Sequence, residues 1–523
     1  MNPIAAPKTL RYEPDAGLPV AIEAKSNRRY FYPSNGQTFS PTNTNVVRMT
    51  LNANSFLDFS HSYLQFTVTN SSTRNLALDH GVPFFNRLQI MSGGQELEDI
   101  QEYSRLYSML TSIQGSRVTG DETSLTSRGR FGGAAAAIAA IPGAAVAGDS
   151  AAQAVAGIDT VVGNLRTAVN GAINNFNGEG VSYLHNDITA AAGALANGES
   201  YTYSIPIISA FFNIEKYFPL LLTEQGIDLY FYLEQGVNIG CWDNAIAGPD
   251  GGYKITEVKY VAHEVNLDDA FVNQMKSSMQ ATGGVLSLAS TTYRYNQVSG
   301  GDVATAGGDF NISCRVKSLK GMLVRPQLSL LNNNKDFMSI STGQALGIKS
   351  AQFRIGSVLY PQSAMQFNGN SASANKGEFF NEIRKCFGTI GSYAHGTMLN
   401  DSTFRASNGA DGQSDAQFRD AASSDTGRAT ANSNFGSGAN SVKQFFTIAY
   451  DFETFAKSAT ESGLNVADRA LPVSINIVKD AVSLKDNADA NLTAANGQIR
   501  LDTFAMCDCI IYIDLMGKIT TRI

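Results

Sequence analysis

The chain has 523 residues, too many for one ordinary domain and enough for two β-sandwich or β-barrel domains of about 250 residues each. Its 39 lysines and arginines against 46 aspartates and glutamates give a net charge of −7, which argues against a protein whose main surface grips nucleic acid. Hydrophobic residues make up 43% of the chain, enough to exclude general disorder. Charged residues are only 16%, so much of the polar surface is uncharged, as occurs where other subunits cover it.

Residues 1–30 are expected to form an extended N-terminal arm. The segment contains four prolines and shows neither a helical nor a strand period. Five basic residues stand beside three acidic ones, and this mixed charge favours contact with another protein over contact with nucleic acid. The segment has no apolar stretch of the kind that marks a secretory signal.

Residues 31–266 are predicted to form one β-domain. Apolar residues at three- and four-residue steps predict a helix over 98–113. Residues 115–198 are rich in Ala, Gly and Asn and are expected to be an inserted, exposed segment. Short runs rich in β-branched and aromatic residues predict strands at 46–51, 62–69, 84–91, 200–208, 226–233 and 253–265.

The second half repeats this order after a helical linker at 267–284. Residues 285–523 are predicted to form a second β-domain, with a helix near 379–387 and a long polar loop at 392–442. Strands are expected at 285–295, 312–325, 352–359, 445–451, 472–478 and 507–515. The shared order indicates a tandem duplication, and the lack of βαβ alternation favours sandwiches with Greek-key connections over a Rossmann-type sheet.

The sequence contains no motif of catalysis or nucleotide binding. Gly517-Lys518 lacks the upstream glycine of a phosphate-binding loop. The cluster Glu96, Glu98, Asp99 and Glu102 is interpreted as the start of a helix, where negative charge is favoured by the helix dipole.

Metal-ligand spacings are also missing from the sequence. No HxH or HExxH pair occurs among His61, His80, His185, His263 and His395. Cys507 and Cys509 are expected to be small core residues, because two residues on one strand face do not make a zinc site. The odd number of cysteines indicates free thiols in a reducing compartment. We therefore predict no catalytic, cofactor-binding or metal site, no cofactor and no enzymatic activity.

Strings spread over both halves carry a family resemblance. They are Tyr30-Phe-Tyr-Pro33 with Asn45-Val-Val-Arg48, Ile205-Pro-Ile-Ile-Ser209 with Lys216-Tyr-Phe-Pro-Leu220, Val316-Lys-Ser-Leu-Lys320, Arg354-Ile-Gly-Ser357 with Tyr360-Pro361, and Ser462-Gly-Leu-Asn465. In this order they resemble the double jelly-roll major capsid proteins of virophages and Polinton-like viruses, and more distantly those of large eukaryotic DNA viruses.

The resemblance implies an all-β chain of two tandem eight-stranded jelly rolls with short helices and long inserted loops. It also implies a capsid protein whose homotrimers form pseudo-hexameric capsomers and tile the icosahedral shell of a double-stranded DNA virus. The partners implied are further copies of the chain in the trimer and in neighbouring capsomers, with penton and minor capsid proteins. The location implied is the virion, after assembly inside the infected host cell.

Two other classes of function are weighed against this one. A two-domain jelly-roll lectin would need exposed aromatic platforms or calcium-ligand runs, and the loops show no Asp/Asn run at calcium spacing. A cupin-like enzyme would need a His/Glu metal cluster on neighbouring strands. Specific nucleic-acid binding is not expected, and the sequence leaves open an inner membrane.

Overall fold

Alternation of buried and half-exposed side chains produces the strands of this protein. In β10 (Ile227–Leu233), Leu229 and Phe231 are buried, and Tyr230 between them is only half-buried. Successive side chains of a strand point to opposite faces, so this pattern buries one face of a sheet.

The structure is a computed structural model, and it describes most of both predicted domains. The described ranges are 24–114, 195–242, 252–333, 339–367, 377–390 and 445–523, with residues 397, 399, 404 and 419–420, except for gaps at 75, 79–83, 215, 282, 341–342, 455–461, 469–470, 481–483 and 486–492.

The first half of the chain forms two antiparallel sheets, which we call roll 1. One sheet has the order β1 (Ala24–Phe31), β12 (Tyr253–Leu267), β4 (Phe56–Asn70) and β8 (Ser200–Ile205), with β2 (Thr38–Phe39) and β9 (Phe218–Pro219) at its margins. The other has the order β3 (Val46–Leu51), β10, β6 (Phe85–Ser92) and β7 (Gln95–Gln101). A small extra pair joins β5 (Leu76–Leu78) and β11 (Gly240–Trp242).

The second half forms two further sheets, which we call roll 2. One sheet has the order β13 (Val285–Asp302), β22 (Gln498–Asp514), β15 (Leu319–Leu328) and β19 (Ile448–Asp451), with β23 (Ile519–Arg522) added to β22. The other has the order β14 (Gly307–Ile312), β20 (Val473–Lys479), β16 (Ile348–Ile355) and β17 (Val358–Gln366). A two-residue pair joins β18 (Arg419–Asp420) and β21 (Leu484–Lys485).

The two rolls share one connectivity. When the eight main strands of each roll are numbered along the chain, one sheet has the order first, eighth, third, sixth, and the other second, seventh, fourth, fifth. In both rolls a helix follows the fifth strand, α1 (Tyr103–Gln114) after β7 and α6 (Gly377–Cys386) after β17. This is jelly-roll topology repeated in tandem, which confirms the predicted fold class.

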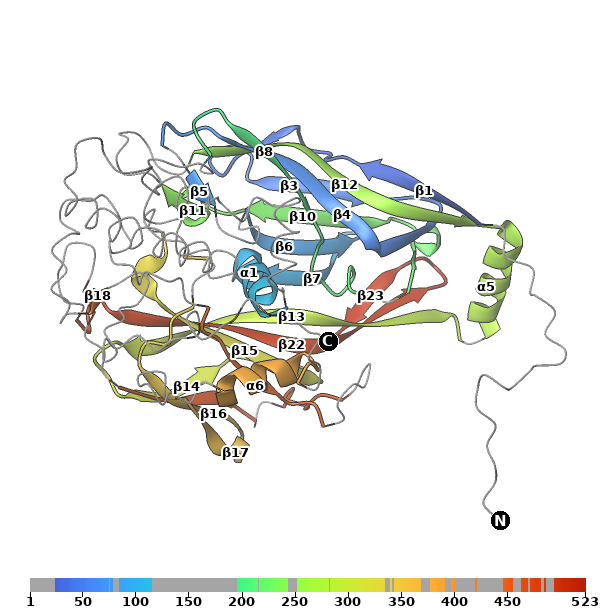
Figure 1. Ribbon diagram of the computed structural model, residues 1–523. Helices are drawn as coiled ribbons and strands as arrows, with labels where there is room; N and C mark the ends of the chain where they lie inside the picture. Colours follow the sequence, from blue (N-terminus) through green and yellow to red (C-terminus); the bar gives the residue numbers. More distant parts are fainter. Residues whose placement is uncertain are drawn as a thin grey trace, which may run out of the picture.

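Roll 1 lies above roll 2 in Figure 1. The β3-β10-β6-β7 sheet runs down from β3 to its edge strand β7, which lies next to β13 of roll 2. Helix α5 (Asp269–Ala281) joins the rolls at one end, within the expected linker 267–284. No helix among the described residues is long and apolar enough to cross a bilayer.

Several predicted elements differ from the observed ones. The helix predicted over 98–113 begins only at Tyr103, because residues 95–101 form a hairpin with β6 across a turn at Gly93 and Gly94, whose φ angles are 57° and 78°. The strand predicted over 312–325 is two strands, since β14 pairs with β20 and β15 pairs with β22, so the chain crosses between sheets.

Two edge strands were wholly or partly missed by the sequence analysis. Residues 24–30, expected in the arm, belong to β1, whose side chains are exposed up to Phe31 and therefore show no alternation. Strand β17 was only partly predicted, because the strand expected over 352–359 covers the end of β16 and the first two residues of β17, which continues through Pro361. Proline is tolerated because β17 lies at a sheet edge, where one side of the strand needs no backbone donors.

The remaining segment predictions fall mainly on residues that the structure does not describe. Of the expected arm, residues 1–23 lie outside the described residues, as do 115–194 of the inserted segment and most of the loop at 392–442. Their roles remain predictions.

Candidate functional site: the junction between the two rolls

The two rolls meet along strand β7 and helix α1. Strand β7 of roll 1 contacts β13 and β23 of roll 2. The Thr521 hydroxyl in β23 donates a hydrogen bond of 2.8 Å to the Leu97 carbonyl in β7. Helix α1 follows directly, and both its apolar and polar side chains are buried, including Ser104 and Arg105. Helix α1 exposes few of its side chains to solvent, because it lies between the two rolls.

Arg105 connects α1 to roll 2 through its two terminal side-chain nitrogens. Its side chain is only 2% exposed. Nε lies 2.9 Å from Glu102 Oε2, and Nη1 lies 2.7 Å from Gln327 Oε1 and 3.4 Å from Asp502 Oδ2. Nη2 donates to Asn332 Oδ1 at 2.9 Å. A guanidinium offers donors in a fixed planar fork, so these contacts set the position of α1 against roll 2.

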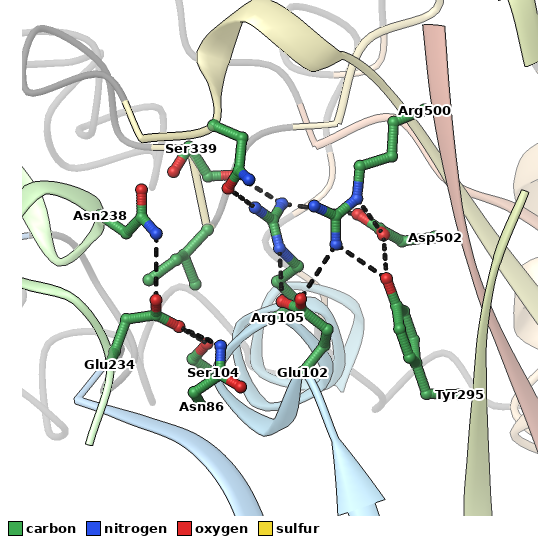
Figure 2. Close-up of polar contacts among 12 residues, drawn as sticks. Asn86, Glu102, Ser104, Arg105, Glu234, Asn238, Tyr295, Ser339, Arg500 and Asp502 are labelled. Atoms are coloured by element: carbon green, nitrogen blue, oxygen red, sulfur yellow. Dashed lines mark hydrogen bonds and ion pairs between the residues drawn. The ribbon is translucent and has the colours of Figure 1, made fainter. Parts of the chain in front are cut away.

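Arg500 and Tyr295 extend this network within roll 2 (Figure 2). Arg500 Nε lies 2.6 Å from Asp502 Oδ1, and its Nη2 lies 3.1 Å from Glu102 Oε1 of roll 1. Burial and the nearby Asp502 carboxylate raise the pKa of Tyr295, so its hydroxyl stays protonated and donates to Asp502 at 2.7 Å. Burial opposes the charge of Arg500, but Asp502 and Glu102 together raise its pKa.

Glu102 holds the two arginines together from a strained position. Its carboxylate contacts Arg105 through one oxygen and Arg500 through the other. Its φ angle is 50°, in the left-handed region that residues other than glycine seldom adopt. The strain occurs where β7 ends and α1 begins, and it places the carboxylate between the rolls.

Arg325 is the least satisfied charge of this junction. It is 1% exposed, and it donates only long hydrogen bonds, 3.3 Å to the Ile340 carbonyl and 3.5 Å to the Ser112 hydroxyl. Its Nε has no partner, and no carboxylate of the described residues lies within ion-pair distance. Burial and the positive charge of Arg105 lower the pKa of Arg325 to about 9. Among the described residues, this buried guanidinium therefore has no direct counter-ion.

A second polar group closes the other side of α1 (Figure 2). Glu234 accepts hydrogen bonds from Asn86 at 2.8 Å, Ser104 at 3.2 Å and Asn238 at 3.0 Å. Asn238 in turn accepts a 2.8 Å hydrogen bond from the backbone of Asn333 in roll 2. This chain of contacts links a carboxylate of roll 1 to the backbone of roll 2.

Glu98 shows that the helix interpretation of the acidic cluster was wrong. Glu96, Glu98 and Asp99 lie on strand β7, and α1 has no acidic residue in its first turn. Glu98 is buried and accepts hydrogen bonds from the Ala210 backbone and from the Thr292 hydroxyl of roll 2. Burial raises its pKa, and these hydrogen bonds offset only part of that rise.

The cysteines expected in the core lie there. Cys507 and Cys509 are fully buried in β22, which confirms the sequence interpretation, and Cys314 and Cys386 are also free thiols. Burial raises the pKa of Cys314 to about 11 and that of Cys509 to about 12, so both stay protonated and unreactive at neutral pH. The side chain of Cys241 lies outside the described residues.

Two of the five histidines are described, and they lie near each other on roll 1. His61 Nδ1 lies 2.6 Å from Asp58 Oδ2, and the rings of His61 and His263 are 5.8 Å apart. Burial alone would raise the pKa of Asp58, but hydrogen bonds from Ser60 and His61 together lower it. Within the described ranges, no three His, Cys, Asp or Glu side chains are placed to hold a metal ion.

Of the junction residues, the sequence analysis singled out only Glu98 and Glu102, as part of the acidic cluster. A signal for others was present, since Arg325 directly follows the apolar run Met322-Leu-Val324 and Asp502 lies between Leu501 and Thr503-Phe504. A charge in such a run must be paired or lie at an interface.

Comparisons with known proteins give structural matches only. No protein-family model and no curated protein matches the chain. VP54 of the virus PBCV-1, fitted into a reconstruction of the virophage Sputnik, has a TM-score of 0.51 at 10% identity, covering 96% of this chain and 97% of that one. A quasi-atomic model of the PBCV-1 capsid has a TM-score of 0.50 with the same identity and coverage. The mavirus major capsid protein scores 0.44 at 10% identity, covering 100% and 96%.

The PBCV-1 matches extend over nearly the full length of both chains. They confirm in fold the resemblance to double jelly-roll capsid proteins that the sequence strings indicated. The low identity means that this likeness concerns the arrangement of the strands.

Proposed function

We propose that this chain is a structural, non-enzymatic protein: a major capsid protein whose homotrimers form pseudo-hexameric capsomers of an icosahedral double-stranded DNA virus shell. One observation carries the proposal. The two rolls have the same connectivity. Within the chain, the fifth strand of roll 1, β7, packs against the first strand of roll 2, β13. The corresponding elements at the other two faces, β17 and β1, have no such partner among the described residues.

Both of these free strands expose apolar or aromatic side chains. In β17, Val358 is 50% exposed and Leu359 is 42% exposed. In β1, Tyr30 is 41% exposed and lies between Arg28 and Lys259, whose charged groups are each 5.3 Å from its ring centre. Exposed apolar groups on strand edges favour contact with another protein chain.

A contact between β17 of one copy and β1 of the next would repeat the contact between β7 and β13 inside the chain. Such a head-to-tail contact closes into a ring when the rotation fits. Three copies then place six similar rolls in one ring, which suits a hexagonal position in a shell. An obligate interface of this kind typically buries about 2,000–5,000 Å².

The further parts of the proposal follow from this role. Partners are other copies of the chain, in the trimer and in neighbouring capsomers, with penton and minor capsid proteins at special positions. The protein is a component of the virion and is assembled inside the infected host cell. Residues 1–23 are proposed to tether neighbouring capsomers, and the inserted segments 115–198 and 392–442 to lie on the outer surface of the shell.

Light scattering coupled to size-exclusion chromatography tests the trimer. We expect a particle of three 55.9 kDa chains that persists on dilution. The double variant Val358→Asp/Leu359→Asp places charges on the exposed edge of β17 and should give folded monomers. Leu515→Asp, at a similarly exposed apolar residue in the turn after β22, serves as the matched control and should remain trimeric. A wild-type monomer at all concentrations would contradict the proposal and leave the lectin-like alternative standing.

Electron microscopy of the same samples tests the shell. Deletion of residues 1–23 stops short of β1, which begins at Ala24, and should therefore leave trimers intact while preventing closed shells. Shells of normal yield from the deleted chain would contradict a tethering role.

A further inference from the structure

A cavity of about 780 Å³ lies between the two rolls, apart from the charged junction at α1. Roll 1 contributes Asn213, Ile214 and Lys216, from the connection between β8 and β9. Roll 2 contributes parts of β13 and β22, the end of α6 and the end of β19. Cavities of this size are typical of sites that hold small organic molecules.

The end of the cavity near β19 carries an excess of negative charge. Lys320 Nζ lies 3.1 Å from Glu453 Oε1 and 3.5 Å from Asp508 Oδ1, so one ammonium group serves two carboxylates. Asp451 also lines the cavity, and one of its oxygens accepts a 2.9 Å hydrogen bond from the Glu453 backbone. No lysine or arginine of the described residues forms an ion pair with Asp451.

The surroundings of Asp451 disfavour its charge. Burial raises its pKa first of all, and the carboxylates of Glu453 and Glu382 raise it further; the hydrogen bond from the Glu453 backbone and the charge of Lys320 offset only part of this rise. Glu382 is itself paired with Lys385. A positive group entering the cavity would therefore meet an uncompensated carboxylate in a partly desolvated place, where attraction is stronger than in water.

Part of the remaining lining is apolar. Met506 and Ile510, four residues apart in β22, lie on the same face of their strand, and Ala289 shares this face because it pairs with Ile510. Ala289, which also lines the cavity, is a small residue on the edge strand β13. A ligand that fits both parts has one cationic end and a short hydrocarbon body.

We propose that this cavity binds a small aliphatic amine, with its ammonium group at Asp451 and Glu453 and its methylene chain along Met506 and Ile510. These groups belong to roll 2, and roll 1 lines the same cavity through Asn213, Ile214 and Lys216. The inference concerns a binding site of the folded chain and does not depend on the proposed role in a capsid.

Hexylammonium is the probe, and the full-length protein is the sample. Isothermal titration should show one saturable site, and the melting temperature should rise with probe concentration. Hexanoate, with the same chain and the opposite charge, should not bind. Sodium chloride at the same ionic strength should not reproduce the rise in melting temperature.

Two variants change the site in different ways. Asp451→Asn removes the unpaired charge and should weaken hexylammonium binding roughly tenfold or more. Ala289→Phe keeps every charge but fills part of the cavity and should abolish binding; it decides the matter if the Asp451→Asn variant fails to fold. Asp480→Asn, which affects the exposed pair of Asp480 with Lys349, is the matched control and should bind normally. Equal binding by wild type and both cavity variants, or equal binding of hexanoate, would overturn the proposal.

Discussion

The junction inside the chain and the two free faces of the rolls use different chemistry at corresponding places. At the junction, charged groups such as Arg105 and Asp502 are almost fully buried and are joined to several partners. At the free faces, β1 exposes Tyr30 beneath the cation of Arg28, and β17 exposes Val358 and Leu359. The rolls are therefore similar in topology but not in the surfaces by which they associate.

This difference follows from how each contact forms. The junction forms within a single chain as that chain folds. Its charged groups therefore pair with each other directly and are never exposed on the surface of a folded protein that waits for a partner. Groups on a free face must remain compatible with water until a partner arrives, which suits exposed aromatic rings and arginines with hydrated charges. Buried ion networks of this type can specify one arrangement, a role we assign to Arg105 as a hypothesis.

Removing Arg105 should have the largest effect on the junction. Arg105→Ala leaves Asp502 and Gln327 buried with fewer partners, and losing one member of a buried ion pair costs about 3–5 kcal/mol. Urea unfolding should show this loss in the free energy of unfolding. Arg105→Lys should recover only part of it, because an ammonium group cannot reproduce the planar fork.

Arg48→Ala supplies the matched control for this prediction. Arg48 is paired with Asp228 at 3.3 Å on the exposed side of roll 1, where such pairs contribute about 0–1 kcal/mol. Equal losses in the Arg105 and Arg48 variants would show that the buried network does not hold the rolls together.

Arg325 offers an intermediate effect of opposite sign. Because Arg325 makes only long contacts and has no direct counter-ion within the described part of the chain, Arg325→Met replaces a costly buried charge with an apolar chain of similar length. We expect stability to rise by roughly 1 kcal/mol. Arg500→Met removes an arginine with short contacts to Asp502 and Tyr295 and should do the reverse. A destabilised Arg325→Met variant would mean that the charge itself supports the junction.

The sequence predicted the tandem architecture well but not the elements that carry association. Alternating runs such as Ile227–Leu233 revealed their strands because one face is buried. Strand β1 was missed because its side chains are exposed up to Phe31, and the start of β17 was merged with β16 because the turn at 356–357 was not recognised. The sequence of an edge strand is less constrained than that of a central strand, so its alternation of apolar and polar residues is harder to recognise.

The junction could not be assembled from the sequence because its members are far apart in the chain. Arg105 and Asp502 are separated by 397 positions, and only the stacking of the rolls brings them together. Glu98 was placed at a helix start because Leu97 and Ile100 continue the apolar spacing of α1. The hairpin with β6, a pairing that helical periodicity does not reveal, decides the matter in favour of a strand.

The Glu98→Gln variant should have the smallest effect. It tests whether every buried charge of the junction is stabilised by its partners. The folded-state pKa of Glu98 is raised, so the folded protein holds the proton more tightly than the unfolded chain does. The contribution of Glu98 to stability is therefore greatest below the ordinary glutamate pKa of about 4.5 and declines as pH rises through the folded-state value. Glu98→Gln cannot ionise, and its side-chain oxygen can still accept from Ala210 or Thr292, so this decline should disappear.

The measurement is the free energy of unfolding in urea at several pH values between about 4 and 8, compared between wild type and the Glu98→Gln variant. Glu96→Gln, on the same strand but with an exposed side chain hydrogen-bonded to Gln89, should leave the wild-type profile unchanged. The difference between wild type and Glu98→Gln should grow with pH, because only the wild type must bury a carboxylate as pH rises. A constant difference across the range would show that Glu98 is ionised with equal ease in both states, and the junction would then resemble the exposed faces more closely than its burial indicates.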